Sequence, residues 1–347
     1  MEFTGRAWSQ ASLPVRFGGL GIRSTVLLAP SAFLASATRA KGLLSQLLPS
    51  SYHSLPDPSV ATALAAWEVQ AGASSALKPT GLLCNSQKAW DTPCCQAIAQ
   101  YLLDSAPDQE SKARLLASRE ETSGLWLKAL PLSSVGLKLE NDAILVAVGL
   151  RLGCNICEPH VCHCGAQVNA KGFHGLACKS SAGRQTRHAL LNDIIWRAFQ
   201  RAQIPSVKEP NGLSRGDGKR PDGVTMIPWA RGRSLTWDVT VPDTLAPSHV
   251  TDSAQTAGHA AAKAEASKTA KYACIAQTHL FVPLAMETLG AWGFQCKEFV
   301  NDLGQRITAV TGERLETTYL KQRLSIAIQR GNAISCRGTL PKYQLSN

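Results

Sequence analysis

Two aspartates lie beside short apolar runs whose residues favour β-strands. Asp222 follows Arg-Pro and precedes Gly-Val-Thr, and Asp238 lies in Leu-Thr-Trp-Asp-Val-Thr, with fifteen residues between the two acids. Arg and Gly residues at 231–233 supply a turn, so the runs should pair as a hairpin that brings the carboxylates together. Paired carboxylates suit a hard divalent cation such as Mg²⁺, which takes oxygen ligands and assists phosphoryl transfer. The alternative is two unrelated surface aspartates.

Cysteine and histidine gather just before these acids. Five of the eleven cysteines fall within residues 154–178. The sequence does not start with a basic segment and an apolar run, and no uncharged stretch could span a membrane, so we expect a reducing compartment and no membrane partner. Clustered Cys and His there hold metal more often than they form disulfides. The spacing predicts structural zinc with four ligands, namely Cys162, Cys164, His174 and Cys178. Free buried thiols are the alternative, and Cys154 or Cys157 could replace one ligand.

Positive charge surrounds both motifs. The net charge is +11, and residues 151–240 hold thirteen Lys and Arg against six Asp and Glu. This favours a polyanionic partner, because phosphate neutralisation dominates nucleic-acid affinity, whereas the alternative is a solvated basic face. The residues predicted to contact DNA are Arg184, Arg187, His188, Arg197, Lys219 and Arg220. His188 could instead cap, pack or replace His174 as a zinc ligand.

The order of these motifs resembles a known family. The chain runs Cys-x-Cys-Gly, Gly-x-His-Gly-Leu-x-Cys, Ser-Ala-Gly-Arg-x-x-Arg-His-x-x-Leu-Asn, Arg-Pro-Asp and Asp-Val-Thr. This order is similar to the end of non-LTR retrotransposon polyproteins that carry a restriction-enzyme-like endonuclease after their reverse transcriptase. The similarity covers residues 150–290, and residues 17–24 and 29–32 resemble the segment that follows the polymerase palm in such proteins.

The resemblance implies a nuclease of the PD-(D/E)xK fold. Such a protein nicks target DNA in the nucleus and exposes a 3′-hydroxyl that primes reverse transcription, so DNA and possibly the element's RNA are the implied partners. Asp222 takes the place of the Asp in the Pro-Asp motif, Asp238 takes the second acidic position, and both would bind the catalytic Mg²⁺. Glu209 is either an accessory acid on a preceding strand or a salt-bridging surface residue.

The expected catalytic lysine is displaced. The fold's name places a lysine two residues after the second acid, but this chain has Thr240 there. The resemblance to the retrotransposon branch implies that the catalytic lysine lies on the next helix instead. Lys268 and Lys271 are three residues apart and so share one helical face. We predict that one of them reaches the acid pair, whereas the alternative is that both are solvated and balance Glu265.

The elements that position these residues predict an α+β protein with three parts. Residues 1–150 are helical and resemble the post-polymerase segment, residues 151–182 form the zinc knuckle, and residues 183–335 form a restriction-like α/β core with C-terminal helices. Apolar spacing predicts helices at 30–48, 59–77, 87–103, 108–121, 140–152, 187–202, 251–275, 285–309 and 313–330. Strands are predicted at 206–210, 221–227, 234–241 and 279–283. The tryptophans of the helical part, Trp67, Trp90 and Trp126, should lie in the core.

Three functional hypotheses follow. The sequence contains no Asp-Asp dipeptide, which a polymerase metal site would need, so we expect a C-terminal piece without that catalytic site. The preferred function is a metal-dependent DNA endonuclease. The second is a zinc-containing nucleic-acid-binding module that has lost cleavage, and the third is an interaction scaffold built on the helical half. The presence of both acids and both lysines favours the first.

Overall fold

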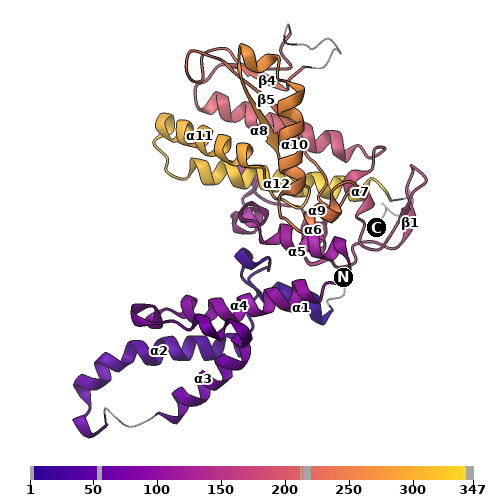
Figure 1. Cartoon of the computed structure of the whole chain (residues 1–347). Coiled ribbons are helices and arrows are strands. Elements are labelled where there is room, and N and C mark those ends of the chain that lie inside the picture. The colour runs from indigo at the N-terminus through magenta and orange to yellow at the C-terminus, as the bar shows by residue number, and fades with distance from the viewer. Residues whose placement is uncertain (1–3, 53–56, 212, 214–219, 341–347) are drawn as a thin grey trace. The chain divides into compact units, whose positions relative to one another are not determined.

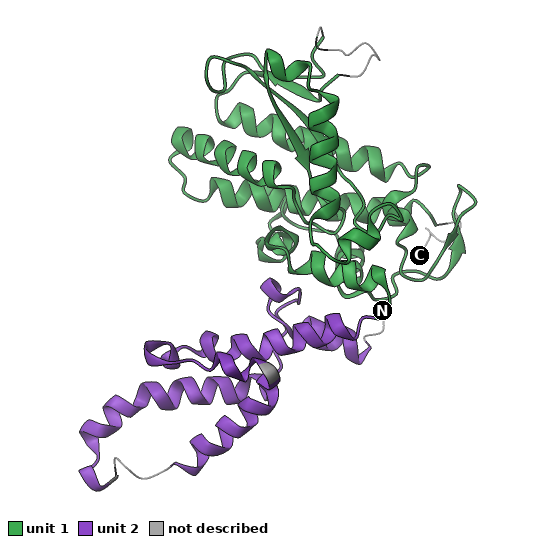
Figure 2. Cartoon of the chain, viewed as in Figure 1, with its two compact units in different colours: residues 1–2, 107–347 green, residues 3–106 purple. Residues whose placement is uncertain are grey.

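The chain is a helix-rich, mixed α/β protein. The computed structural model describes residues 4–52, 57–211, 213 and 220–340 (Figure 1). It divides into two compact units, residues 3–106 and residues 107–347 with residues 1–2 (Figure 2). The division falls near residue 106 and not near residue 150 as expected. None of the helices described is long and apolar enough to cross a membrane.

Helices alone build the core described for residues 3–106, which are unit 2 in Figure 2. Its α-helices are α1 (Gly5–Ser12), α2 (Thr25–Leu47), α3 (Pro58–Ala71) and α4 (Gln87–Asp104). Trp67 and Trp90 meet edge to face with ring centroids 5.1 Å apart, and the Trp67 indole N–H donates to the carbonyl of Trp90 at 2.7 Å. Both rings are buried, as predicted. The indole groups therefore join α3 to α4 by packing and by a satisfied polar contact.

Helix α2 begins earlier than the sequence predicted. The Ser24 hydroxyl accepts a hydrogen bond from the N–H of Leu27 at 3.5 Å and caps the helix before Thr25. Pro30 therefore lies inside the helix and does not open it. Because proline has no N–H, the turn at Pro30 lacks one ladder bond, and the cap provides a start one turn earlier.

The other unit, residues 107–347 with residues 1–2 and labelled unit 1 in Figure 2, contains a four-stranded sheet. Its strands are β3 (Ser206–Lys208), β4 (Gly223–Thr225), β5 (Leu235–Thr240) and β6 (Leu280–Ala285), in that order across the sheet. Strands β3, β4 and β5 run antiparallel, and β6 runs parallel to β5. A parallel pair needs a crossover. Here the crossover contains α9 (Val250–Ser253) and α10 (His259–Lys271), which were predicted as one helix. The helical conformation is interrupted between α9 and α10, where Gly258 has a left-handed φ of 79°.

The two faces of β5 have different neighbours. Successive side chains of a strand point to opposite faces. Leu235, Trp237 and Val239 are buried in one apolar core. The helices that share this core are α8 (Gly183–Arg201), α11 (Phe294–Thr311) and α12 (Glu316–Arg337). Asp238 points to the other face, where α10 packs beside β6.

Residues 107–152 belong to unit 1 of Figure 2 because they share a core with α12. Helices α5 (Gln109–Arg119) and α6 (Asn141–Leu152) bury apolar side chains in a cluster that includes Ile326, Ala333 and Cys336. Trp126 is also buried in this cluster, as predicted. The hydroxyl of Tyr319 adds a hydrogen bond to the carbonyl of Val135 at 2.9 Å. These contacts cross nearly two hundred sequence positions, so local pattern does not reveal them.

Candidate functional site

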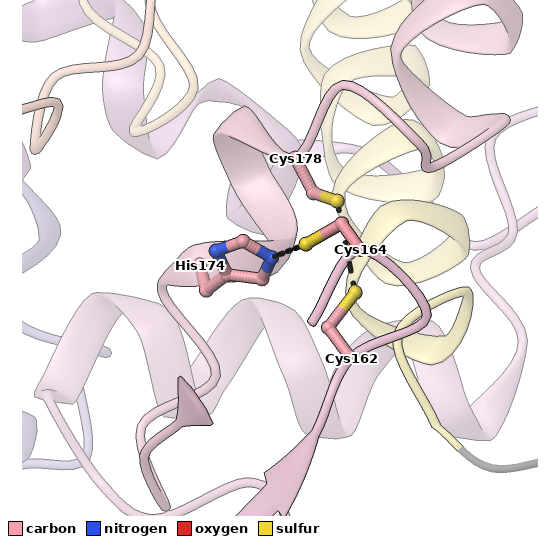
Figure 3. Close-up of side chains that lie close together, drawn as sticks. All are labelled: Cys162, Cys164, His174 and Cys178. Atoms are coloured by element: carbon pink, nitrogen blue, oxygen red, sulfur yellow. Dashed lines mark hydrogen bonds between the residues drawn. The ribbon is translucent and has the colours of Figure 1, made fainter. Parts of the chain in front are cut away.

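Four side chains of the knuckle converge on one point. Strand β1 (His160–Val161) pairs antiparallel with β2 (Gln167–Val168), and the turn between them carries Cys162 and Cys164. The third side chain is that of His174, the first residue of the short helix α7 (His174–Ala177), and the fourth is that of Cys178, which follows this helix. The four potential ligand atoms all lie within 4.8 Å of one another (Figure 3).

The donor set fits zinc. The sulfurs of Cys162 and Cys178 are 3.7 Å apart, and Cys164 Sγ lies 3.2 Å from Nε2 of His174. Tetrahedral zinc with Zn–S bonds of about 2.3 Å would separate two sulfurs by about 3.8 Å. Burial raises the pKa of Cys162 to about 11, so this thiol keeps its proton at neutral pH unless a cation replaces it. The four predicted ligands therefore form a cluster that could hold a metal ion and is compatible with zinc.

The alternative cysteines lie outside this cluster. The Cys157 thiol contacts the carbonyls of Asn169 and Ala170 at 3.5 and 3.6 Å, and Cys154 is buried elsewhere. Among the described residues, no other group of three or more Cys, His, Asp and Glu side chains converges in this way. The commoner Cys-x2-Cys spacing is therefore not the one used.

The knuckle packs closely on the end of α12. A Cβ atom on Gly175 would lie 2.7 Å from the Cα of Cys336, and one on Gly183 would lie 2.5 Å from the Cα of Ser335. The hydroxyl of Ser181 donates to the carbonyl of Ser335 at 3.2 Å. Glycine is required at 175 and 183 because the two backbones approach too closely for a side chain.

The two acids lie at the same end of neighbouring strands. Gly223 pairs with Trp237 in the β4–β5 ladder, and the N–H of Asp222 donates to the carbonyl of Trp237 at 2.9 Å. A Cβ on Gly223 would come within 2.0 Å of the Trp237 ring. The glycine after Asp222 therefore lets β4 approach this ring. Oδ2 of Asp222 accepts a hydrogen bond from the N–H of Val239 at 2.5 Å, directly after Asp238.

One oxygen of each acid is held by a basic side chain. Lys268 of α10 forms an ion pair with Oδ1 of Asp238, whose side chain is only 5% exposed. Nε2 of His188 lies 3.1 Å from Oδ2 of Asp222. The hydrogen bond to Asp222 raises the pKa of His188, and the nearby charge of Asp238 acts in the same direction. The described hydrogen bonds therefore occupy Oδ2 of Asp222 and Oδ1 of Asp238.

Two other predicted catalytic side chains lie elsewhere. Nζ of Lys271 lies 3.3 Å from the hydroxyl of Tyr272 and above its ring. Of the two lysines, it is Lys268 that forms an ion pair with one of the acids, Asp238. Glu209 is exposed and forms an ion pair with Arg220. Glu209 comes directly after β3, with a left-handed backbone (φ 49°), and its side chain contacts Arg220. These contacts do not support the accessory role and match the alternative of a salt-bridging surface residue.

The predicted DNA contacts need one clear correction. Arg187 is 2% exposed, and its guanidinium donates to the amide oxygen of Asn332 at 2.7 Å and to the carbonyl of Leu176 at 3.1 Å. Burial lowers its pKa to about 10, so it stays charged at neutral pH, but it cannot reach DNA. The ring of His188 contacts Asp222, but its side chain is 42% exposed, so its contact with DNA stays a prediction.

The remaining predicted contacts are on the surface where they are described. Arg184 and Arg197 of α8 are exposed, and Arg197 pairs with Asp193 one turn earlier. Arg220 is exposed and pairs with Glu209. Lys219 lies outside the described residues. Arg184 is exposed and forms no ion pair with any of the described residues, so its side chain is the best placed of the set for phosphate and it stays the leading prediction.

Sequence reasoning missed two residues that position the lysine helix. Glu265 is buried, and its carboxylate accepts the N–H groups of Gln295 at 3.2 Å and Cys296 at 2.9 Å, capping α11. Burial raises the pKa of Glu265. The Tyr272 hydroxyl donates to the carbonyl of Arg220 at 3.0 Å, two residues before Asp222. The signal was available, because Glu265 lies one turn after the buried Ala261 and so shares its face.

Comparisons with known proteins do not assign the chain to a family. No family model matches it, and no curated protein matches it significantly.

Proposed function

We propose that residues 107–340 form a metal-dependent DNA endonuclease with a restriction-enzyme-like core of the PD-(D/E)xK type. The observation that carries the proposal is the placement of Asp222 and Asp238 beside each other on neighbouring strands, with Lys268 of the next helix ion-paired to Asp238. The sequence order strand, turn, strand, helix brings them together, and a basic segment surrounds them.

Each residue has a distinct role in this proposal. Oδ1 of Asp222 and Oδ2 of Asp238 are the carboxylate oxygens for Mg²⁺, because the other oxygen of each acid is hydrogen-bonded. When bound, the cation supplies a polarised phosphate and a more acidic water. The ammonium of Lys268, held beside Asp238, can stabilise negative charge that develops on phosphate. Thr240 cannot do this, since its hydroxyl carries no charge.

The zinc cluster has a structural role in this proposal. All four positions of its ligand set are protein side chains, which is the closed arrangement typical of structural zinc. The proposed substrate is DNA that is nicked for target-primed reverse transcription, in the nucleus, by part of a retrotransposon protein without the polymerase site. The element's RNA is a further proposed partner.

Nicking of supercoiled plasmid in the presence of Mg²⁺ tests the function. The intact chain should convert supercoiled to open-circular DNA, and Asp222→Ala should reduce the rate by about 10³-fold, because several kcal/mol of metal-assisted stabilisation are lost. The matched control is Asp302→Ala, which removes a partly exposed carboxylate paired with Arg306 and should leave the rate unchanged. DNA binding without Mg²⁺-dependent nicking by the intact chain would favour the non-cleaving binding module.

DNA affinity at several salt concentrations tests the basic surface. Arg184→Ala should weaken binding to all sequences alike and lower the slope of log affinity against log salt by about 1, because one phosphate contact is lost. Arg314→Ala, an exposed arginine between α11 and α12, is the control. If both variants keep the slope of the unmodified protein, Arg184 does not contact phosphate.

A further inference from the structure

The first two turns of α8 contact both candidate metal sites. Arg187 and His188 are adjacent in sequence, but their side chains go to different places. The Arg187 guanidinium donates to the carbonyl of Leu176, which lies between His174 and Cys178 of the zinc cluster. The ring of His188 reaches Asp222 and the carbonyl of Val239, each at 3.1 Å. The side chains of two adjacent residues of α8 therefore contact the knuckle and Asp222.

The contacts of His188 define its hydrogen-bonding state. Both partners of Nε2, the carboxylate of Asp222 and the carbonyl of Val239, are acceptors. Nε2 must therefore carry the proton and donate it between them. Together with the N–H of Val239, this donor fixes Oδ2 of Asp222. Two donors to Oδ2 set the plane of the Asp222 carboxylate, and they therefore also set the direction in which Oδ1 points.

Arg187 has little room to move. It is 2% exposed, and a Cβ on Gly331 of α12 would lie 2.6 Å from its Cβ. Asn332 holds the same guanidinium and in turn donates to the carbonyl of Thr288 at 2.7 Å. A displaced Leu176 would leave a buried charged group without one of its acceptors, which is costly. The start of α8 is therefore sensitive to the position of the knuckle.

We propose that the start of α8 couples the two metal sites. Zinc in the knuckle fixes Leu176 and so Arg187, and His188 then holds Asp222 in the orientation that binds the divalent cation. This inference rests on the proposed function, because it assigns Asp222 to a cation site. His188 acts here as a positioning residue, and partners that orient a metal ligand typically contribute about 10- to 100-fold to metal affinity.

Direct binding of Mn²⁺ to the full zinc-loaded chain tests the proposal without any turnover. The electron paramagnetic resonance signal of free Mn²⁺ measures binding. His188→Leu, which removes the donor, should weaken binding about 10-fold or more, whereas His188→Gln, which keeps an N–H donor at a similar reach, should stay within a few-fold of the unmodified chain. The His188 side chain is 42% exposed, so both replacements should fold. Near-ultraviolet circular dichroism checks this.

A separate variant tests the link between zinc and the cation site. Cys164→Ser replaces an exposed ligand of the cluster. It should lose zinc, increase hydrogen exchange in residues 183–192, and weaken Mn²⁺ binding to the level of His188→Leu. Wild-type Mn²⁺ affinity in the zinc-free variant would overturn the coupling, and equal weakening by His188→Gln and His188→Leu would overturn the donor role. Asp222→Ala separates the hypotheses: if it binds Mn²⁺ normally, the cation site of the proposed function fails as well.

Discussion

Replacement of Lys268 by alanine should slow Mg²⁺-dependent nicking by about 10²–10³-fold and change DNA affinity little. Lys268 is the only basic side chain described in an ion pair with Asp238. Removal of one preorganised group that faces developing charge typically costs this factor. The phosphate contacts that dominate affinity lie on other side chains, so binding should persist. Single-turnover nicking and metal-free DNA binding measure the two quantities separately.

Two lysines of the same helix are the matched controls for Lys268. Lys263 is exposed, with its ammonium 3.5 Å from the carbonyl of Ser248, and Lys271 lies against Tyr272. Lys263→Ala should leave the nicking rate unchanged, and Lys271→Ala should reduce it far less than Lys268→Ala. If the Lys271 variant shows the larger loss, the catalytic assignment moves to Lys271. If all three variants nick equally well, no lysine of α10 takes part.

Loss of zinc should have the largest effect on stability. Structural zinc supplies about 10–16 kcal/mol of apparent binding free energy in small zinc folds. Even if only several kcal/mol of it supports this unit, Cys178→Ser should lower Tm by about 10 °C or more. The thiol is buried and 3.7 Å from Cys162, so hydroxyl replacement removes a ligand and leaves a polar group inside. Metal analysis should give one zinc per unmodified chain and much less for the variant.

Cys157→Ser is the control for the zinc prediction. Cys157 belongs to the same segment and is partly buried, but its thiol contacts backbone carbonyls and not the cluster. This variant should keep its zinc, and its Tm should fall much less. A protein without zinc, or a Cys178→Ser variant with full zinc content, would contradict the ligand assignment.

The sequence predicted best where contacts are local. Cys162, Cys164, His174 and Cys178 lie within seventeen residues, so their spacing nearly determines the cluster. Asp222 and Asp238 come together through a hairpin, whose register follows from turn and strand pattern. The sequence predicted that Lys268 or Lys271 contacts the acids but could not choose between them. The choice depends on the rotation of α10 about its axis, which the contacts of Glu265 with the start of α11 help to set.

The sequence predicted poorly where contacts are distant. Arg187 is basic and follows the knuckle, and on these grounds the sequence predicts a DNA contact. Its spacing from the buried Leu191 and Ile195 places it on the inner face of α8, a signal that its charge concealed. Its acceptor Asn332 lies 145 positions away. The unit boundary was misplaced for the same reason, since residues 107–150 pack on a helix near the other end of the chain.

Helix α12 also sets the order in which this unit can be completed during synthesis. It contacts α6, α7, α8 and α11, yet it is the last helix of the described chain to be translated. Until residue 337 has been made, the apolar faces of those earlier helices lack their common partner. Nascent chains with such exposed faces are prone to aggregate or to bind chaperones. We therefore expect the unit to complete its packing only after α12 has been synthesised, and a ribosome stalled before α12 should hold a chain whose earlier helices expose apolar faces.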